Sequence, residues 1–72
     1  MLEVGSLVKF VWWSSYRAPS LTTDDHGHVT WHELNPGDTG IVISYLNEDN
    51  VVVLFSKVSR LLRIHRSMLD LV

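Results

Sequence analysis

The sequence lacks cysteine, carries little charge and contains no long hydrophobic run, and each absence excludes a class of protein. Without cysteine, the 72 residues can form neither a disulfide framework nor a thiolate zinc site. The longest apolar run, residues 51–55, is far shorter than the roughly 20 residues of a helical membrane span. The first residues lack the basic head of a signal peptide. We therefore expect a cytoplasmic protein without a membrane segment.

The composition is that of an ordinary small globular chain. Hydrophobic residues make up 46% and charged residues 19%, a balance that argues against disorder. A chain of this length has room for one core, so residues 1–72 are predicted to form a single domain. A core of this size rarely contributes more than about 3 to 5 kcal/mol, and no disulfide is available to add to it.

The first third of the chain predicts one strand followed by a long loop. Residues 7–13 (LVKFVWW) are branched and aromatic and lie between Gly-Ser and Ser-Ser, which is typical of a strand. Its core-facing residues would be Val8, Phe10 and Trp12. Residues 14–27 collect Ser, Thr, Pro, Asp and Gly without periodicity and are predicted to be a long loop, which is usually functional or mobile. Residues 28–34 alternate as a strand arm of that loop.

The middle of the chain predicts a turn and a hairpin. Asn-Pro-Gly-Asp at residues 35–38 favours a tight turn, because Pro fixes its backbone φ angle and Gly readily adopts a positive φ. Residues 40–46 and 51–55 are β-rich and are joined by four polar residues, 47–50, which suit a hairpin loop.

Two periodicities compete in residues 56–72. Val58, Leu61, Leu62, His65, Met68, Leu69 and Val72 fall on helical spacing, with Ser56 as an N-cap. Alternatively, Leu62 and Ile64 alternate with polar residues in a strand over 61–65. A tight turn at 66–68 and a last short strand at 69–72 would then follow. We favour the strands.

This order of elements resembles an SH3-like barrel. It implies an all-β fold of five strands, with a long loop after the first strand and one short 3-10 turn before the last. Residues 37–42 (GDTGIV), followed by Val-Val-Val at 51–53, resemble the KOW motif of ribosomal and transcription-elongation proteins, which implies nucleic-acid binding. A looser similarity to small SH3-like proteins of tailed bacteriophages rests on the Gly-hydrophobic-Val opening and on the ending from Ile64 to Leu69.

Three aromatic residues beside the long loop are candidate partner-binding residues. Trp12 and Trp13 are adjacent, so the two side chains cannot face the same core from one strand. Trp13 is then covered by the loop that carries Tyr16 or by Trp31, or it stays exposed as an anchor at a protein interface, where Trp and Tyr are enriched. Trp13, Tyr16 and Trp31 form the predicted partner-binding set.

A basic strip near the C-terminus is the candidate nucleic-acid surface. Lys57, Arg60, Arg63 and Arg66 are spaced three apart and hold four of the six basic residues. Such a strip can meet phosphate or an acidic protein surface, although it can equally keep a sheet edge soluble. Residues 37–55 contain no Lys or Arg and three acidic side chains, which would repel a phosphate backbone.

A cluster of histidines and carboxylates at residues 24–33 is the candidate metal site. It contains Asp24, Asp25, His26, His28, His32 and Glu33. These are possible zinc or transition-metal ligands, and on a strand His26, His28 and His32 would share one face. No His-Glu-x-x-His motif supports them, and a solvated polar loop explains the same residues.

The sequence therefore favours a non-catalytic protein-interaction or assembly module that binds a protein, its own copies included. KOW-like nucleic-acid binding through residues 57–66 is the second hypothesis, and metal binding by the histidines is the third. No Gly-x-Ser-x-Gly elbow and no glycine-rich phosphate loop before a helix is present, so we expect neither an enzyme nor a cofactor.

Overall fold

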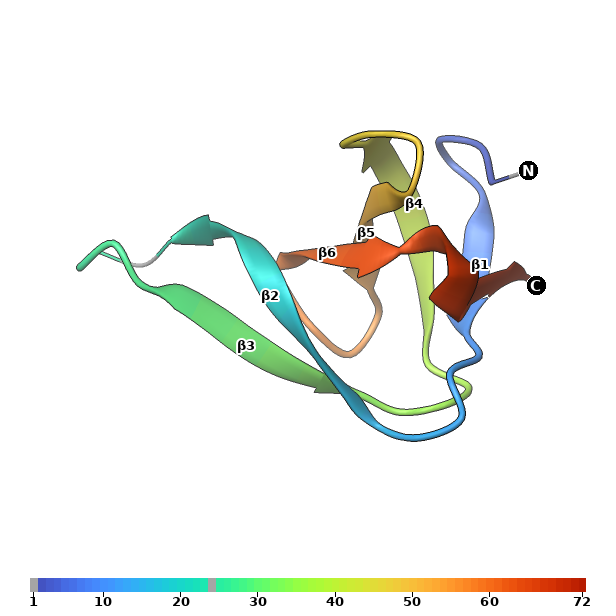
Figure 1. Ribbon diagram of the computed structural model, residues 1–72, viewed down its shortest axis with the longest axis horizontal. Helices are drawn as coiled ribbons and strands as arrows, with labels where there is room; N and C mark the ends of the chain where they lie inside the picture. The colour runs from blue at the N-terminus through green and yellow to red at the C-terminus, as the bar shows by residue number, and fades with distance from the viewer. Residues whose placement is uncertain (1, 24) are drawn as a thin grey trace.

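The computed structural model describes residues 2–23 and 25–72, which form seven β-strands and one 3-10 turn (Figure 1). In chain order these are β1 (Leu7–Phe10), β2 (Tyr16–Thr23), β3 (Val29–Leu34), β4 (Thr39–Tyr45), β5 (Asn50–Phe55), β6 (Leu61–His65), η1 (Arg66–Met68) and β7 (Leu69–Leu71). All strand pairs are antiparallel, in the order β3-β2-β6-β5-β4-β1-β7. The all-β prediction is confirmed, and the sheet is open, with β3 and β7 at its two ends.

The long loop expected at residues 14–27 is instead one arm of a β-hairpin, which corrects the predicted count of five strands to seven. β2 pairs with β3 from Tyr16↔Leu34 to Pro19↔Trp31 and again at Thr23↔Val29. The Ala-Pro-Ser centre of β2 has low strand propensity, and these three residues are buried in succession. The alternation by which a half-buried strand is recognised is therefore missing from the sequence.

β1 ends at Phe10 rather than at residue 13, although its core-facing pattern is confirmed. Val8 and Phe10 are completely buried, and β1 lies between β4 and β7. At its end the chain leaves the sheet. The backbone N–H of Phe10 donates to the Asp38 carbonyl at 2.7 Å, and the N–H of Val11 donates to the Met68 carbonyl at 2.8 Å. Trp12 is half-buried against the core.

The hairpin of β4 and β5 is confirmed. Its ladder runs from Gly40↔Phe55 to Tyr45↔Val51, with Ile43 as an extra residue in β4. The connecting turn is held by the Asn47 side chain, whose oxygen accepts from the N–H groups of Asp49 and Asn50, both at 2.9 Å. Asn is favoured in turns because its side chain can satisfy backbone donors in this way.

The strand interpretation of residues 56–72 is confirmed and the amphipathic helix does not form. β6 buries Leu62 and Ile64 and exposes Arg63 and His65, as the alternation predicts. The imidazole Nδ1 of His65 accepts from the backbone N–H of Ser67 at 3.2 Å, so His65 caps the turn η1. The turn redirects the chain into β7, which pairs with β1.

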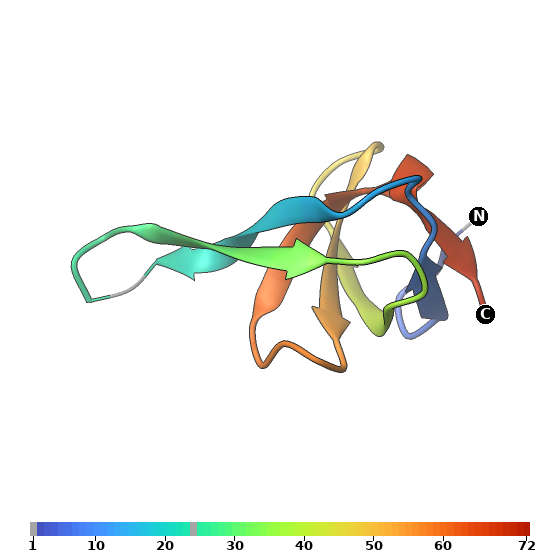
Figure 2. The same ribbon diagram turned by 90° about the horizontal axis from the view of Figure 1, so that it is seen from below.

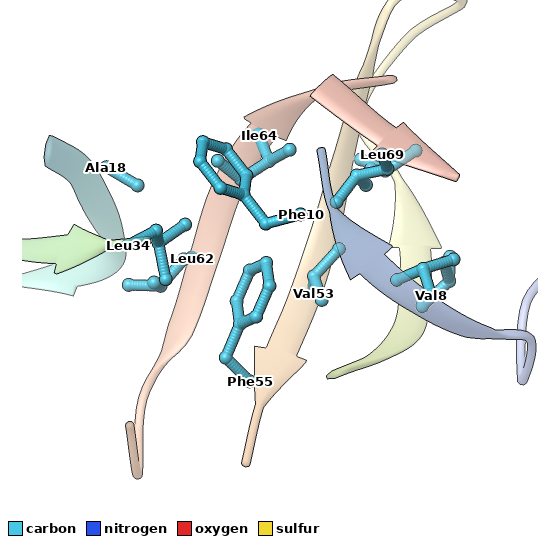
Figure 3. Close-up of a cluster of buried hydrophobic side chains, with 11 residues drawn as sticks. Val8, Phe10, Ala18, Leu34, Val53, Phe55, Leu62, Ile64 and Leu69 are labelled. Atoms are coloured by element: carbon cyan, nitrogen blue, oxygen red, sulfur yellow. The ribbon is translucent and has the colours of Figure 1, made fainter. Parts of the chain in front are cut away.

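The strongly curved sheet wraps around a single cluster of buried hydrophobic side chains to which every strand contributes. Figure 3 shows Phe10, Phe55, Leu62 and Leu34 pointing toward one another, with Ile64 and Leu69 beside them. The two phenylalanines are the largest fully buried side chains. The core therefore lies under β1, β5 and β6, and the β2-β3 hairpin contributes to it only near its base, through Ala18 and Leu34.

Candidate interaction surface

The β2-β3 hairpin has a packed base and a projecting end. Near the base, Ala18 and Leu34 are buried in the core and Tyr16 packs against it. Beyond this base the hairpin extends away from the rest of the sheet, as Figures 1 and 2 both show. From Leu21 to Val29, every described residue is exposed. The projecting end therefore buries little side-chain surface against the rest of the sheet.

A polar network joins the two strands where their regular pairing is interrupted. The register of β2 and β3 shifts between Pro19 and Thr23, and the buried Ser20 lies in this gap. Its hydroxyl donates to the Thr22 carbonyl at 2.7 Å and accepts from the backbone N–H of Thr30 at 3.2 Å. The Thr30 hydroxyl lies 3.0 Å from it. The Ser20 side chain thus replaces ladder hydrogen bonds that the irregular strand cannot make.

An open groove of about 380 Å³ lies where the hairpin meets the body of the sheet. It is lined by Pro19, Ser20, Leu21, Val29, Leu46 and Arg63. Leu21, Val29 and Leu46 are each more than two-fifths exposed, so its walls are largely accessible apolar side chains. Arg63 contributes a cation to the same groove.

Trp31 lies beside this groove. It stands directly opposite Pro19 in the β2-β3 ladder and two positions after Val29 on β3. Residues two apart on a strand face the same side, so the Trp31 ring is on the groove side of the hairpin. Its side chain is 55% exposed. Trp is enriched at protein interfaces, so an accessible indole on the groove side of the hairpin is a candidate anchor for a partner.

A second apolar region crosses the outer face of the sheet. The ladders align Leu7 with Ile41, Ile41 with Leu54, and Leu54 with Leu61, across four neighbouring strands. The first three of these side chains are between 39% and 51% exposed. Each strand contributes one hydrophobic residue to this row. The row can therefore be identified only when the register between neighbouring strands is known.

The three predicted partner-binding aromatics occupy three different environments. Trp13 is 82% exposed and has Trp12 as its ring neighbour, at 6.5 Å between centroids. Tyr16 is half-buried and stacks on Phe10 at 6.3 Å, so it supports the core. Trp31 lies at the groove. Of the two alternatives for Trp13, the covered one is wrong, because the segment that carries Tyr16 forms a hairpin and leaves the Trp13 indole accessible.

Two members of the predicted basic strip form ion pairs. Lys57 Nζ lies 2.7 Å from Asp38 Oδ2, and Arg66 Nε lies 3.7 Å from Asp49 Oδ1. The backbone N–H of Arg66 also donates to the Asp49 carbonyl at 2.8 Å. Arg63 lines the groove and Arg60 is exposed in the β5-β6 connection. Pairing with acidic side chains lowers the positive potential that a phosphate backbone would meet.

Asp38 is the acidic centre of the turn at residues 35–38. Partial burial opposes its ionisation, but the backbone N–H of Asn35, at 2.7 Å, and the ammonium group of Lys57 outweigh that effect. Together these groups hold the pKa of the Asp38 carboxyl below its ordinary value. The turn also places Gly37 at φ 98°, which explains the glycine at this position.

The Asp38 carboxylate should make stability depend on pH in the acid range. Because its pKa is lowered in the folded state, its contribution is fully present above the ordinary Asp pKa of about 3.9. The contribution is lost as the pH falls through the lower folded-state pKa. In Asp38→Asn, which retains an oxygen acceptor for Asn35, urea unfolding at neutral pH should show lower stability than wild type, and this difference should shrink toward pH 2. An undiminished difference at low pH would contradict this assignment.

The histidines of the predicted metal site are spread along the hairpin. His26 and His28 lie in its terminal turn with ring centroids 6.4 Å apart, whereas the His32 Nε2 is 3.2 Å from the Thr30 hydroxyl on β3. Asp24 falls outside the described residues. Within residues 2–23 and 25–72, no three His, Asp or Glu side chains converge in a geometry that could hold a metal ion.

A second hollow of about 440 Å³ lies beside the turn η1. Its lining includes Leu2, Tyr45, His65, Arg66, Ser67 and Asp70. The Tyr45 hydroxyl donates to the Leu2 carbonyl, and the Ser67 hydroxyl lies 2.8 Å from the Nδ1 atom of His65. These contacts tie the first residues to β4 and complete the His65 cap, which gives the polar side chains of this hollow a structural role.

Comparisons with protein families, with curated proteins and with solved structures find no match to this chain. The residues that make the groove, chiefly Pro19, Leu21, Val29 and Leu46, were not singled out from the sequence. They could have been identified if the alternation of residues 29–34 had been combined with pairing of that strand to residues 16–23. Among the residues that the structure describes, no helix has the length and apolarity needed to cross a membrane.

Proposed function

We propose that this protein is a non-catalytic interaction or assembly module that binds a protein through the exposed side of its β2-β3 hairpin. The observation that carries the proposal is the accessible Trp31 beside an apolar groove walled by Leu21, Val29 and Leu46. Large contiguous apolar patches on the surface of a monomeric protein often mark interaction sites. Trp31 would act as the anchor and Arg63 would orient an acidic group of the partner.

The scaffold we infer is an SH3-like barrel. Support comes from the order β7-β1-β4-β5-β6, in which the five strands expected from the sequence are successive neighbours. The 3-10 turn between β6 and β7 and the hairpin inserted between β1 and β4 also agree with that architecture. In this arrangement the meander is the rigid part, and the inserted hairpin presents the binding residues, as functional loops on stable scaffolds do.

A protein partner fits these features better than nucleic acid does. Lys57 and Arg66 are each paired with an aspartate, which lowers the positive charge that these two side chains offer to a phosphate backbone. The apolar groove offers no row of cations along which a phosphate backbone could lie. The net charge of −2 points in the same direction.

Association in the producing cells tests this function. Tagged wild-type protein, isolated under native conditions, should retain a protein companion at a constant ratio, and Trp31→Glu should reduce that companion at least about tenfold, because a charge replaces the anchor. Arg60→Glu, an exposed change away from the groove, should retain it, and nuclease should have no effect. Retention by Trp31→Glu together with nuclease-sensitive loss in Arg60→Glu would instead indicate nucleic-acid binding.

A further inference from the structure

The outer edge of β3 is an open strand edge. In the sheet order β3 is last, so within the described residues β2 is its one strand neighbour. Figure 1 shows β3 running along the margin of the molecule, on the side of the hairpin away from β6. A strand in this position presents unpaired backbone N–H and C=O groups, which form a template for pairing with another strand.

β3 carries few of the features by which proteins usually protect such an edge, since Glu33 is its one carboxylate. Its six residues, Val-Thr-Trp-His-Glu-Leu, include β-branched and aromatic side chains but no Lys, Pro or Gly. Pro19 is on β2, and the register shift lies in the ladder between β2 and β3. Neither feature blocks the outer edge of β3. The opposite end of the sheet is different, because β7 has only three residues and offers a much shorter edge.

The sequence of β3 is compatible with pairing to itself. A two-fold axis perpendicular to the sheet at Trp31 would place Trp31 opposite Trp31 of the second copy. It would also place Val29 opposite Glu33, and Thr30 opposite His32, twice each. Glu33 is the one carboxylate in the strand, and in this register it does not face its own equivalent. Aromatic cross-strand pairs are favourable, and no like charges meet.

The shape of the molecule permits this approach. The hairpin projects beyond the rest of the sheet in both views, so two copies can bring their β3 edges together while their cores stay apart. Pairing through β3 joins the longer edge strand of each copy. The shorter edge strands, β7 of each copy, then form the two ends of the joined sheet. The contact is isologous, so it closes at two copies and does not continue into a filament.

We propose that β3 pairs antiparallel with β3 of a second copy of this chain, joining the two sheets into one across a two-fold axis at Trp31. This inference goes beyond the proposed function, because it adds a contact through the backbone edge of β3 to the binding surface at the groove. The two grooves then lie on the same side of the joined sheet, because the axis is perpendicular to it. Each Trp31 ring stands between the groove of its own hairpin and the indole of the second copy.

The mass of the purified protein in solution tests the pairing. Sedimentation equilibrium should show a rise from 8.3 kDa toward twice that mass with increasing concentration. Thr30→Lys and Trp31→Lys place a cation at the edge and should raise the dissociation constant at least about tenfold. Ser59→Lys places the same cation at an exposed position in the β5-β6 connection, outside β3, and should dimerise like wild type. Thermal melting of each variant shows whether its fold is retained.

Because the chain has no cysteine, an engineered thiol can locate the axis. Directly opposed residues have Cβ atoms about 4.5 to 5.5 Å apart, within a small shift of the spacing in a disulfide, so Trp31→Cys should oxidise readily to a disulfide-linked dimer, whereas Ser59→Cys in the exposed β5-β6 connection should not. A wild-type protein that remains a monomer at all concentrations would overturn the pairing, as would a dimer unaffected by both lysine variants. If a monomeric wild type still retains a different protein through Trp31, the proposed function stands and only the self-pairing fails.

Discussion

Replacing Phe10 by alanine should leave the protein largely unfolded at room temperature. Phe10 is completely buried, and its ring contacts the core from the end of β1 while stacking on Tyr16 at the base of the hairpin. Truncating a buried phenylalanine costs about 3 to 5 kcal/mol. That loss equals the whole stability expected of a domain this small. Far-UV circular dichroism and urea unfolding would measure it.

Leu7→Ala on the same strand is the matched control for Phe10→Ala. The Leu7 side chain is half-exposed on the opposite face of β1, so its truncation should cost less than about 1 kcal/mol. In a domain of this length, 1 kcal/mol corresponds to roughly 4 to 8 °C in melting temperature. A Phe10→Ala variant that melts within about 5 °C of wild type would show that the core is not centred where the structure places it.

Gly40→Ala should be the most damaging single-methyl change in the chain. A Cβ atom on Gly40 would lie 2.7 Å from the Leu54 carbonyl oxygen and 3.0 Å from the Phe55 Cα atom. Both neighbours are backbone atoms of β5, which cannot rotate away. The two central strands would have to separate, at a cost of about 3 kcal/mol, the upper part of the range for overpacking.

The next residue supplies the control for Gly40→Ala. Ile41 is 45% exposed on the outer face of β4, so Ile41→Thr keeps a β-branched strand residue and should change stability by less than about 1 kcal/mol. Both variants would be compared by urea unfolding with wild type. Equal stability of Gly40→Ala and wild type would mean that β4 and β5 are farther apart than the structure shows. In the sequence this glycine begins a β-rich run within the KOW-like motif, and the structure shows that it allows close approach of two strands.

The elements that sequence reasoning predicted are those whose local signals agree. The hairpin at residues 39–55 has β-branched arms and an Asn that closes the turn with its own side chain. β6 alternates buried and exposed residues, so its period distinguishes it from a helix. In both places local propensity and the tertiary environment favour the same conformation.

In the β2-β3 hairpin, the strand predicted over residues 28–34 is confirmed as β3, whereas β2 could not be read from the sequence because its stability is not local. Ala18, Pro19 and Ser20 are held in a strand by pairing with β3 and by the Ser20 hydroxyl, which reaches Thr30 ten residues away. The aromatic set was predicted by residue type, and the adjacency of Trp12 and Trp13 left open whether Trp13 is covered or exposed. Only the register shows that Trp31 stands over Pro19 beside the groove.

The arrangement of the basic strip, Lys57, Arg60, Arg63 and Arg66, also could not be predicted from residue spacing. Its spacing of three suggested one cationic surface, yet β6 ends between Arg63 and Arg66, so the four side chains do not follow one straight face. The acids that pair with Lys57 and Arg66 come from turns 19 and 17 positions earlier in the chain. Long-range pairing of this kind is set by strand order, which composition and spacing do not encode.

Photo-crosslinking from within the groove tests the proposed interaction surface most directly. A benzoylphenylalanine would replace Leu21 in the groove or, as control, the exposed Ser59 in the β5-β6 connection. In the cells that make the protein, irradiation should join position 21 to one protein of defined mass, with position 59 giving no such adduct. Adducts formed with nucleic acid, or formed from position 59 and not from position 21, would contradict the assignment of this hairpin as the binding surface.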